Sequence, residues 1–316
     1  MKKFIKQFVL FLSFFAMAYC LMVCVIGEFA PYHFRNVLNY RLGSNGYLHS
    51  KIKEIKDYKN VDILFIGTSH AYRGFDVRIF KDKGYHTFNL GSSIQTPIQT
   101  HILFQRYLDK LQPKLVVYDV NPEIFGSDGV ESALDVISND SINWDSCKMA
   151  VEVNNVKTYN TLIFALYKQI TNANANFKEP IVRAKDTYIS GGFVEKEITT
   201  LTSDKQYDKV RYQLDEQQLR FFTQNLQMLR DRKIPFVLVH MPLTKRLYQS
   251  KLNYPEFSKL MQHKSGGSYY DFNQMIKLDD SLHFYDDNHL NQNGVTIFDA
   301  FFISKMEEEK VLVSDN

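Results

Sequence analysis

The stretch that decides the fold is Val61-Asp62-Ile63-Leu64-Phe65-Ile66-Gly67-Thr68-Ser69-His70. Its first half is an apolar run with the length and composition of a short buried strand. Gly67 then permits a sharp turn, so that Ser69 projects beyond the strand with its backbone N–H available to an oxyanion. A serine in this position suits acyl-transfer chemistry if a histidine and a carboxylate reach it. Without such partners, the same residues are an ordinary strand-to-helix turn in which Ser69 caps the helix.

Apolar runs alternate with segments of helical spacing along most of the chain. We predict strands at 61–66, 85–90, 114–120, 235–239 and 268–272. Helices are predicted at 76–83, 97–111, 215–232 and 291–306. This alternation is typical of a mainly parallel sheet that is covered by helices on both faces, so the predicted fold class is three-layer α/β/α. Ligands bind at the carboxyl ends of strands in such sheets, and Ser69, Gly91 and Asn121 all follow predicted strand ends.

A second polar cluster, Asp286-Asp287-Asn288-His289-Leu290, lies near the other end of the chain. Asp286 and His289 are three residues apart, so one turn of helix would bring the carboxylate and the imidazole to the same side. We therefore expect Asp286 to orient His289, with Asp287 as the alternative carboxylate. His289 is then the expected base for the serine. The alternative bases are His70, His240 and His283.

These segments resemble, in content and in order, the sequence blocks of the SGNH (GDSL-like) hydrolase superfamily. Residues 66–70 are similar to its nucleophile block, 88–91 to its glycine block, and 286–294 to its last block, and the resemblance covers roughly residues 60–306. The resemblance implies an SGNH or flavodoxin-like sheet and a triad of Ser69, His289 and Asp286. It also implies an oxyanion hole formed by the N–H groups of Ser69 and Gly91 and by the amide of Asn121. The Gly-x-Asn-Asp pattern that usually surrounds this asparagine is absent.

The N-terminal segment has the properties of a membrane anchor. Residues 8–26 contain no charged side chain, and a helix rising about 1.5 Å per residue over that length crosses most of the roughly 30 Å hydrocarbon layer. Lys2, Lys3 and Lys6 precede the segment, and basic residues favour the cytoplasmic side. The sequence thus predicts a single pass through the cell membrane, with the N-terminus cytoplasmic and the remainder extracytoplasmic. A cleaved signal peptide is the alternative, because Ala16-Met17-Ala18 is similar to a cleavage site.

Five segments are expected along the chain. They are a cytoplasmic tail at 1–7, the transmembrane anchor at 8–26, a membrane-proximal linker at 27–59, an SGNH-like domain at 60–306 and a C-terminal tail at 307–316. Within the domain, residues 126–212 interrupt the alternation of strands and helices. An insertion of this length is typical of a substrate-binding cap, and passive helical packing is the alternative.

Composition excludes several classes of function. The chain has 316 residues, 45% hydrophobic and 23% charged, with a net charge of +3. This composition suits one globular core and gives no broad cationic surface, so we predict no nucleic-acid partner. Cys147 is the only cysteine outside the anchor, and no cysteine and histidine spacing is typical of a zinc site. We predict no disulfide in the domain, no metal and no cofactor.

The anchor, the Gly-Thr-Ser-His block and an Asn-Pro-Glu-Ile-Phe segment together resemble cell-envelope members of the superfamily. Among these are the D-alanine transfer protein of teichoic-acid modification and members paired with membrane-bound O-acyltransferases. The resemblance implies a serine esterase or O-acyltransferase that acts on an acylated envelope polysaccharide or polymer through an acyl-enzyme at Ser69. The alternative is a catalytically silent partner that docks a membrane-bound O-acyltransferase or binds a glycan.

Overall fold

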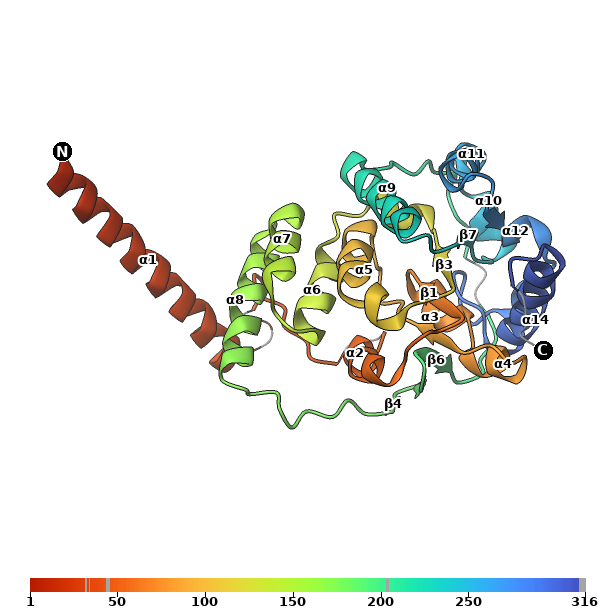
Figure 1. Cartoon of the computed structure of the whole chain (residues 1–316), viewed down its shortest axis with the longest axis horizontal. Helices are drawn as coiled ribbons and strands as arrows, with labels where there is room; N and C mark the ends of the chain where they lie inside the picture. Colours follow the sequence, from red (N-terminus) through yellow and green to blue (C-terminus); the bar gives the residue numbers. More distant parts are fainter. Residues whose placement is uncertain (32, 34, 44–45, 203–204, 313–316) are drawn as a thin grey trace.

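The core of the molecule is a five-stranded parallel sheet with strand order β2-β1-β3-β7-β8. The computed structural model describes residues 1–31, 33, 35–43, 46–202 and 205–312. The strands are β1 Ile63–Ile66, β2 Thr87–Asn89, β3 Leu115–Asp119, β7 Phe236–His240 and β8 Tyr269–Asp271. Each lies inside or within one residue of a predicted strand, and helices flank the sheet (Figure 1), so the predicted α/β fold class is confirmed. The strand order is the flavodoxin-like one, which reverses between β1 and β3.

Alternate side chains of β1, β3 and β7 enter two separate apolar clusters, one on each face of the sheet. Leu64 and Ile66 of β1 belong to one cluster, whereas Ile63 and Phe65 belong to the other. The first cluster is covered by α2 Leu48–Glu54, α5 Pro97–Leu111, α9 Glu216–Asp231 and α11 Tyr254–Ser265. The second is covered by α4 Val77–Asp82, α12 Phe272–Met275 and α14 Gln292–Glu308. The parallel strands are therefore buried on both faces, as their continuous apolar composition predicts.

Polar caps set the starts of the predicted helices. The side chains of Asp76, Asp215 and Asn291 accept hydrogen bonds from backbone N–H groups in the first turns of α4, α9 and α14. Each of these residues satisfies a donor that has no partner inside its helix, which explains why the helices begin there. The helix α5 has Pro97 at its first position instead, and its bounds match the prediction.

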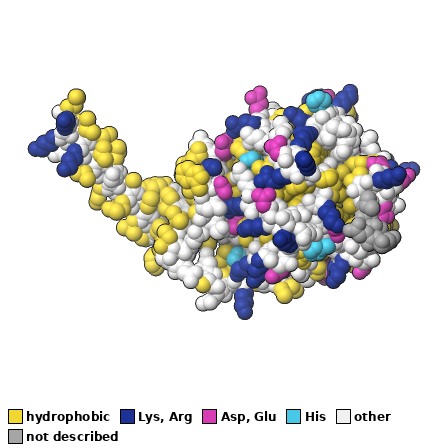
Figure 2. Space-filling view, viewed as in Figure 1, with side chains coloured by type: hydrophobic (Ala, Val, Ile, Leu, Met, Phe, Trp, Pro, Cys, Tyr) yellow, Lys and Arg dark blue, Asp and Glu magenta, His cyan; other side chains and the backbone are white. Residues whose placement is uncertain are grey.

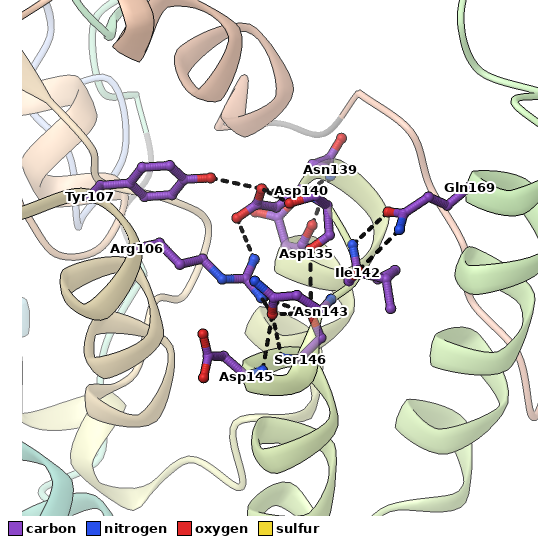
Figure 3. A network of polar contacts seen from close by, with 11 residues as sticks. Arg106, Tyr107, Asp135, Asn139, Asp140, Ile142, Asn143, Asp145, Ser146 and Gln169 are labelled. Atoms are coloured by element: carbon purple, nitrogen blue, oxygen red, sulfur yellow. Dashed lines mark hydrogen bonds and ion pairs between the residues drawn. The ribbon is translucent and has the colours of Figure 1, made fainter. Parts of the chain in front are cut away.

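The segment expected as an insertion folds into three helices and a small antiparallel sheet. These are α6 Val130–Asn139, α7 Trp144–Val153, α8 Val156–Ile170, β4 Val182–Arg183, β5 Asp186–Ile189 and β6 Phe193–Lys196. Arg106 of α5 holds the helices in place by donating to Asp140, Asn143 and Ser146, and the Tyr107 hydroxyl donates to Asp140 as well (Figure 3). The proposed role of this segment as a substrate cap stays a prediction.

The helix α1 Lys2–Phe29 projects from the domain (Figure 1), and beyond the lysines at its free end its exposed side chains are mostly apolar (Figure 2). It is long and apolar enough to span a membrane. The remaining elements are short: η2 Ile55–Asp57, α3 Ser69–Gly74, η3 Pro122–Gly126, α10 Lys245–Gln249 and α13 Asp280–His283. Of the C-terminal tail predicted at 307–316, residues 313–316 lie outside the described residues.

Candidate active site

Ser69 lies at the first position of α3, directly after the turn that follows β1. Gly67 in that turn has φ +138°, and a Cβ atom there would lie 2.6 Å from Asp119 Cβ, so only glycine fits. Thr68 is the helix cap, because its side chain accepts from the His70 N–H at 3.1 Å. The cap is therefore not Ser69, whose hydroxyl is left for other contacts. Its N–H lies in the first turn, where a helix offers no internal acceptor.

The hydroxyl of Ser69 meets the imidazole of His289. Ser69 Oγ lies 2.7 Å from His289 Nε2, although the two residues are 220 positions apart in the sequence. His289 Nδ1 lies 2.9 Å from Asp286 Oδ1 and 3.0 Å from Oδ2. Because a carboxylate only accepts, Nδ1 carries the proton and Nε2 is left as the acceptor for the serine hydroxyl. The arrangement is that of a nucleophile, a base and an orienting acid.

The loop that carries Asp286 and His289 is not helical. Residues 285–288 form bends and His289 has no regular secondary structure, so the expected helical turn is wrong. The carboxylate itself shapes the loop, since Asp286 Oδ1 accepts from the backbone N–H groups of Asn288 and His289, both at 2.8 Å. Burial acts to raise the pKa of Asp286, but the hydrogen bonds from the His289 ring and from the backbone outweigh it and hold this pKa below its usual value. Asp286 therefore stays ionised beside the imidazole.

Asp287, the alternative carboxylate, faces the other way. It accepts from Thr244 Oγ1 at 2.9 Å, Arg246 Nε at 2.5 Å and the Tyr207 hydroxyl at 2.8 Å. These bonds attach the loop to residues 244–246 and leave Asp287 without a contact to His289 among the described residues. Asp286 is therefore the carboxylate that orients the imidazole.

His70 is buried and fully engaged with two neighbouring segments. The Asn121 amide uses its oxygen to accept from the Glu123 N–H, so its Nδ2 faces His70 Nδ1 at 3.2 Å. The His70 ring also donates to the backbone carbonyl of Asn288. Nδ1 is thus the acceptor and the other nitrogen carries the proton. Burial, followed by the charges of His289 and His240, holds the pKa of His70 well below its usual value. This neutral ring joins Asn121 to the catalytic loop and has no nitrogen left to act as base.

The two remaining histidines lie away from the serine. His240 is completely buried, with its Nδ1 3.5 Å from Asp271 Oδ1. His283 Nδ1 accepts from the Asp279 N–H at 2.8 Å. Neither has a contact with Ser69 in the described part of the chain, so both are excluded as its base in this conformation.

Two of the three implied oxyanion donors already have partners. The Gly91 N–H donates to Asn89 Oδ1 at 3.1 Å, and the amide of Asn121 is occupied by His70. On the other side of Gly91, its carbonyl accepts from Lys51 Nζ at 2.6 Å, and this lysine of α2 is completely buried. Of the three donors, the Ser69 N–H has no acceptor in the described part of the chain, whereas the other two would have to leave their present partners to bind an oxyanion.

Sequence reasoning missed the groups that support the triad. Tyr285 stacks on His289 with ring centroids 5.4 Å apart and an interplanar angle of 3°. Arg73 lies over the Tyr285 ring and forms two 2.9 Å hydrogen bonds with Asp186 of β5, so the small sheet reaches the active site through this pair. Buried Asp119 accepts from Thr68 at the base of the nucleophile turn. Of these residues, only Asp119 could have been noticed in the sequence, because its carboxylate interrupts the apolar run Leu-Val-Val-Tyr-Asp-Val.

A small cavity lies beside the histidine of the triad. The cavity beside His289, which His70, Arg73 and Met241 also line, has a volume of about 10 Å³. Cavities of about 640 and 780 Å³ lie elsewhere and are lined by neither Ser69 nor His289. Within the described ranges, no three His, Cys, Asp or Glu side chains are grouped so as to hold a metal ion.

Comparison with known proteins gives structural neighbours of low similarity. No protein-family model matches the sequence, and no curated protein is similar enough to count as a match. The chain is similar in structure to a protein described as an acylhydrolase from Bacteroides fragilis, with 12% identity, a TM-score of 0.30, and coverage of 84% of this chain and 98% of that chain. It is also similar to a GDSL-like lipase from Bacteroides thetaiotaomicron, with 14% identity, a TM-score of 0.28, and coverage of 83% and 99%.

At such low similarity the neighbours say nothing about the activity of this chain. The fold and the site define it as an α/β protein with a serine, histidine and aspartate constellation at the carboxyl edge of a parallel sheet. In the order of its blocks and in the site that these blocks build, it resembles the SGNH hydrolases.

Proposed function

We propose that the protein is an SGNH-type serine esterase or O-acyltransferase that forms an acyl-enzyme at Ser69. The observation that supports this most is the 2.7 Å contact between Ser69 Oγ and His289 Nε2, with Asp286 on the far side of the ring. Burial of the serine turn and the ionised carboxylate favour transfer of a proton from the hydroxyl to the imidazole.

The reaction follows from this geometry. Ser69 Oγ attacks the acyl carbon of an ester while His289 Nε2 takes the hydroxyl proton, and Asp286 stabilises the imidazolium. The tetrahedral intermediate collapses, and the leaving alcohol takes the proton back from His289. Water or a sugar hydroxyl then repeats the sequence in reverse, which gives hydrolysis or transfer. The Ser69 N–H stabilises the oxyanion, and Gly91 joins it once the Asn89 side chain moves aside.

The proposed setting is the outer face of the cell membrane. Residues 8–26 of α1 anchor the protein, with Lys2, Lys3 and Lys6 on the cytoplasmic side, and the domain acts on an acylated envelope polysaccharide or polymer. A membrane-bound O-acyltransferase is the proposed partner. The apolar surface of α1 and the resemblance to envelope members of the superfamily support this setting.

Hydrolysis of a simple activated ester tests the proposed chemistry. The full chain is purified in detergent, and its turnover of p-nitrophenyl acetate is compared with that of Ser69→Ala and of Ser304→Ala, an exposed serine on α14 that serves as control. We expect Ser69→Ala alone to lose the activity. Equal turnover by all three proteins would exclude Ser69 as the nucleophile.

A catalytically silent partner is the second candidate. The observations that favour it are the occupied N–H of Gly91, the occupied amide of Asn121 and the small volume beside His289. In this case the domain docks a membrane-bound O-acyltransferase or holds a glycan. A strain that carries Ser69→Ala together with His289→Ala would then acylate its envelope polymer normally, whereas a deletion strain would not. Loss of acylation in both strains would favour catalysis.

A further inference from the structure

The helix α8 packs along the outer end of α1 through three kinds of contact. The Tyr19 hydroxyl donates to Asn160 Oδ1 at 2.6 Å. Gly27 lies against the Phe164 ring so closely that a Cβ atom would be 2.5 Å from the ring carbons. Lys168 Nζ pairs with Glu28 Oε2 at 2.6 Å. Because residue numbers increase together in these pairs, the two helices run side by side in the same direction.

The opposite face of α8 is apolar and is exposed at both ends, whereas Ile163 in its middle packs against the cluster of Val23, Leu38 and Phe164. The side of the helix that faces the domain is buried through Thr158, Thr161 and Ala165. Its outward stripe repeats every three or four residues and consists of Val156, Tyr159, Ile163, Leu166 and Ile170. Val156 is 59% exposed, Leu166 42% and Ile170 76%. Large apolar side chains that are exposed together on one helix face are typical of a surface that contacts a further apolar partner.

The contacts with α1 set the depth of this stripe. Tyr19 lies seven residues before Ile26, the last residue of the uncharged segment. At a rise of about 1.5 Å per residue, its partner Asn160 is therefore about 10 Å inside the outer end of that segment. Helices that lie in a membrane interface bury their apolar faces by roughly 5–10 Å. The ion pair of Lys168 with Glu28 lies at the outer end of the contact.

We propose that the outward stripe of α8 lies against the lipid bilayer, in the interfacial layer beside α1. The inference rests on the proposed anchoring of α1. Figure 2 shows the apolar side chains of α1 continuing onto the adjoining edge of the domain. The bilayer is the occupant that this continuity favours, because α8 enters it alongside a helix that is itself surrounded by lipid.

The consequence is a fixed orientation of the catalytic domain. A single anchor helix on a flexible linker would let the domain tumble above the membrane. Contact through both α1 and α8 fixes which side of the domain faces the membrane. The triad is then held at a constant distance from the membrane surface. Substrates anchored in or close to the membrane are then favoured over polymer far from it.

Tryptophan fluorescence in liposomes tests the proposal. The single tryptophan, Trp144, is first replaced by phenylalanine in the full chain. A reporter is then introduced as Leu166→Trp on the stripe or, as matched control, as Ile297→Trp. Ile297 is also exposed, and it lies on α14 at the end of the domain far from α1 (Figure 1). Each protein is reconstituted into phosphatidylcholine and phosphatidylglycerol vesicles with brominated acyl chains, and flotation confirms its anchoring.

We expect the emission of Leu166→Trp to shift to shorter wavelength and to lose intensity in brominated vesicles, with no change for Ile297→Trp. If Leu166→Trp floats with the vesicles and still behaves like the control, the stripe does not face lipid and a partner protein is the better occupant. Failure to float would contradict the anchor itself, so the two failures are distinguishable. Esterase activity plays no part in either readout.

Discussion

Thr68 and Asp119 join the two central strands of the sheet at the base of the active site. Asp119 Oδ2, at the end of β3, accepts from both the N–H and the hydroxyl of Thr68, at 3.1 and 2.6 Å. Thr68 is the residue directly before Ser69, and Asp119 is completely buried. The pair thereby fixes the turn that presents the serine hydroxyl, at the point where the strand order reverses.

Because Asp119 is buried, we predict that its contribution to the free energy of unfolding depends on pH. Burial raises the pKa of this carboxyl from 3.8 to about 6, although the bonds from Thr68 act in the opposite direction. Between these values the folded chain holds a proton that the unfolded chain has lost. The stabilisation is therefore complete below about pH 4 and is lost as the pH rises through 6. A shift of about two pH units corresponds to roughly 3 kcal/mol.

Asp119→Asn, which is neutral at every pH, should remove this term. We expect the free energy of unfolding of the variant to rise relative to that of the unchanged chain between pH 4 and 7. Urea unfolding at each pH measures the difference, and it cancels the contributions of other carboxylates such as Asp286. A difference that stays constant over this range would show that Asp119 does not titrate as described.

Gly67 should tolerate no side chain. Its φ of +138° and the 2.6 Å approach of a Cβ atom to Asp119 Cβ combine backbone strain with a clash against the residue that holds Thr68. We expect Gly67→Ala to lower the free energy of unfolding by about 3 kcal/mol or more. Gly84→Ala is the matched control, because Gly84 also has a positive φ, +87°, with nothing within 4 Å, and should cost only about 1–2 kcal/mol. If the two variants lost the same free energy of unfolding, the neighbours of Gly67 would have to move and make room for the new Cβ atom.

The sequence allowed the sheet and its covering helices to be predicted because both have strong periodicity. The apolar run 61–66 and the helix that begins at Pro97 are set by residues adjacent in the sequence, so both can be predicted without knowledge of the fold. The contact of Ser69 with His289 could be predicted only from the order of the blocks, since no local pattern brings together residues so distant in sequence. The turn at Asp286 shows the limit of spacing, because hydrogen bonds from backbone N–H groups, and not a helix, bring the imidazole to the carboxylate.

The roles of Asn121 and Gly91 show a second limit. Both residues follow strand ends, as predicted. However, the backbone N–H of Gly91 and the side-chain amide of Asn121 are already hydrogen-bonded to other side chains. Asn89 lies two residues before Gly91, and His70 is 51 residues from Asn121, and neither pairing has a signature in the sequence. Lys51, in a segment expected as a linker, is likewise buried under Gly91 because α2 packs into the core.

Two neighbouring aspartates should differ sharply in their effect on activity. Asp286→Asn removes the charge that fixes the His289 tautomer and stabilises the imidazolium, so we expect kcat for ester hydrolysis to fall roughly 10³- to 10⁴-fold. Asp287→Asn is the control, since Asp287 contacts Thr244, Arg246 and Tyr207 on the other side of the loop. Its kcat should change by less than about tenfold. The reverse ranking would identify Asp287 as the orienting carboxylate.

His70 should act by position and not by proton transfer. Its ring accepts from Asn121 and donates to the Asn288 carbonyl, and a glutamine side chain carries an acceptor and a donor of the same kinds. We expect His70→Gln to keep most of the turnover. His70→Leu, which loses both bonds at similar size, should lower kcat/KM by about 10²-fold.

Thermal unfolding of both His70 variants checks that they fold. A glutamine variant as inactive as the leucine variant would contradict a positioning role and indicate that the imidazole itself takes part in proton transfer. Full activity in the leucine variant would show that the contacts to Asn121 and Asn288 do not hold the catalytic loop.

The most direct test of the proposed nucleophile is labelling of the full chain with a fluorophosphonate, followed by mass spectrometry of the peptides. The contact of Ser69 Oγ with His289 Nε2 predicts one adduct, on the peptide that contains Ser69, and its loss in both Ser69→Ala and His289→Ala. An adduct on another serine, or a folded chain that stays unlabelled, would contradict the proposal that these two side chains form an active nucleophile.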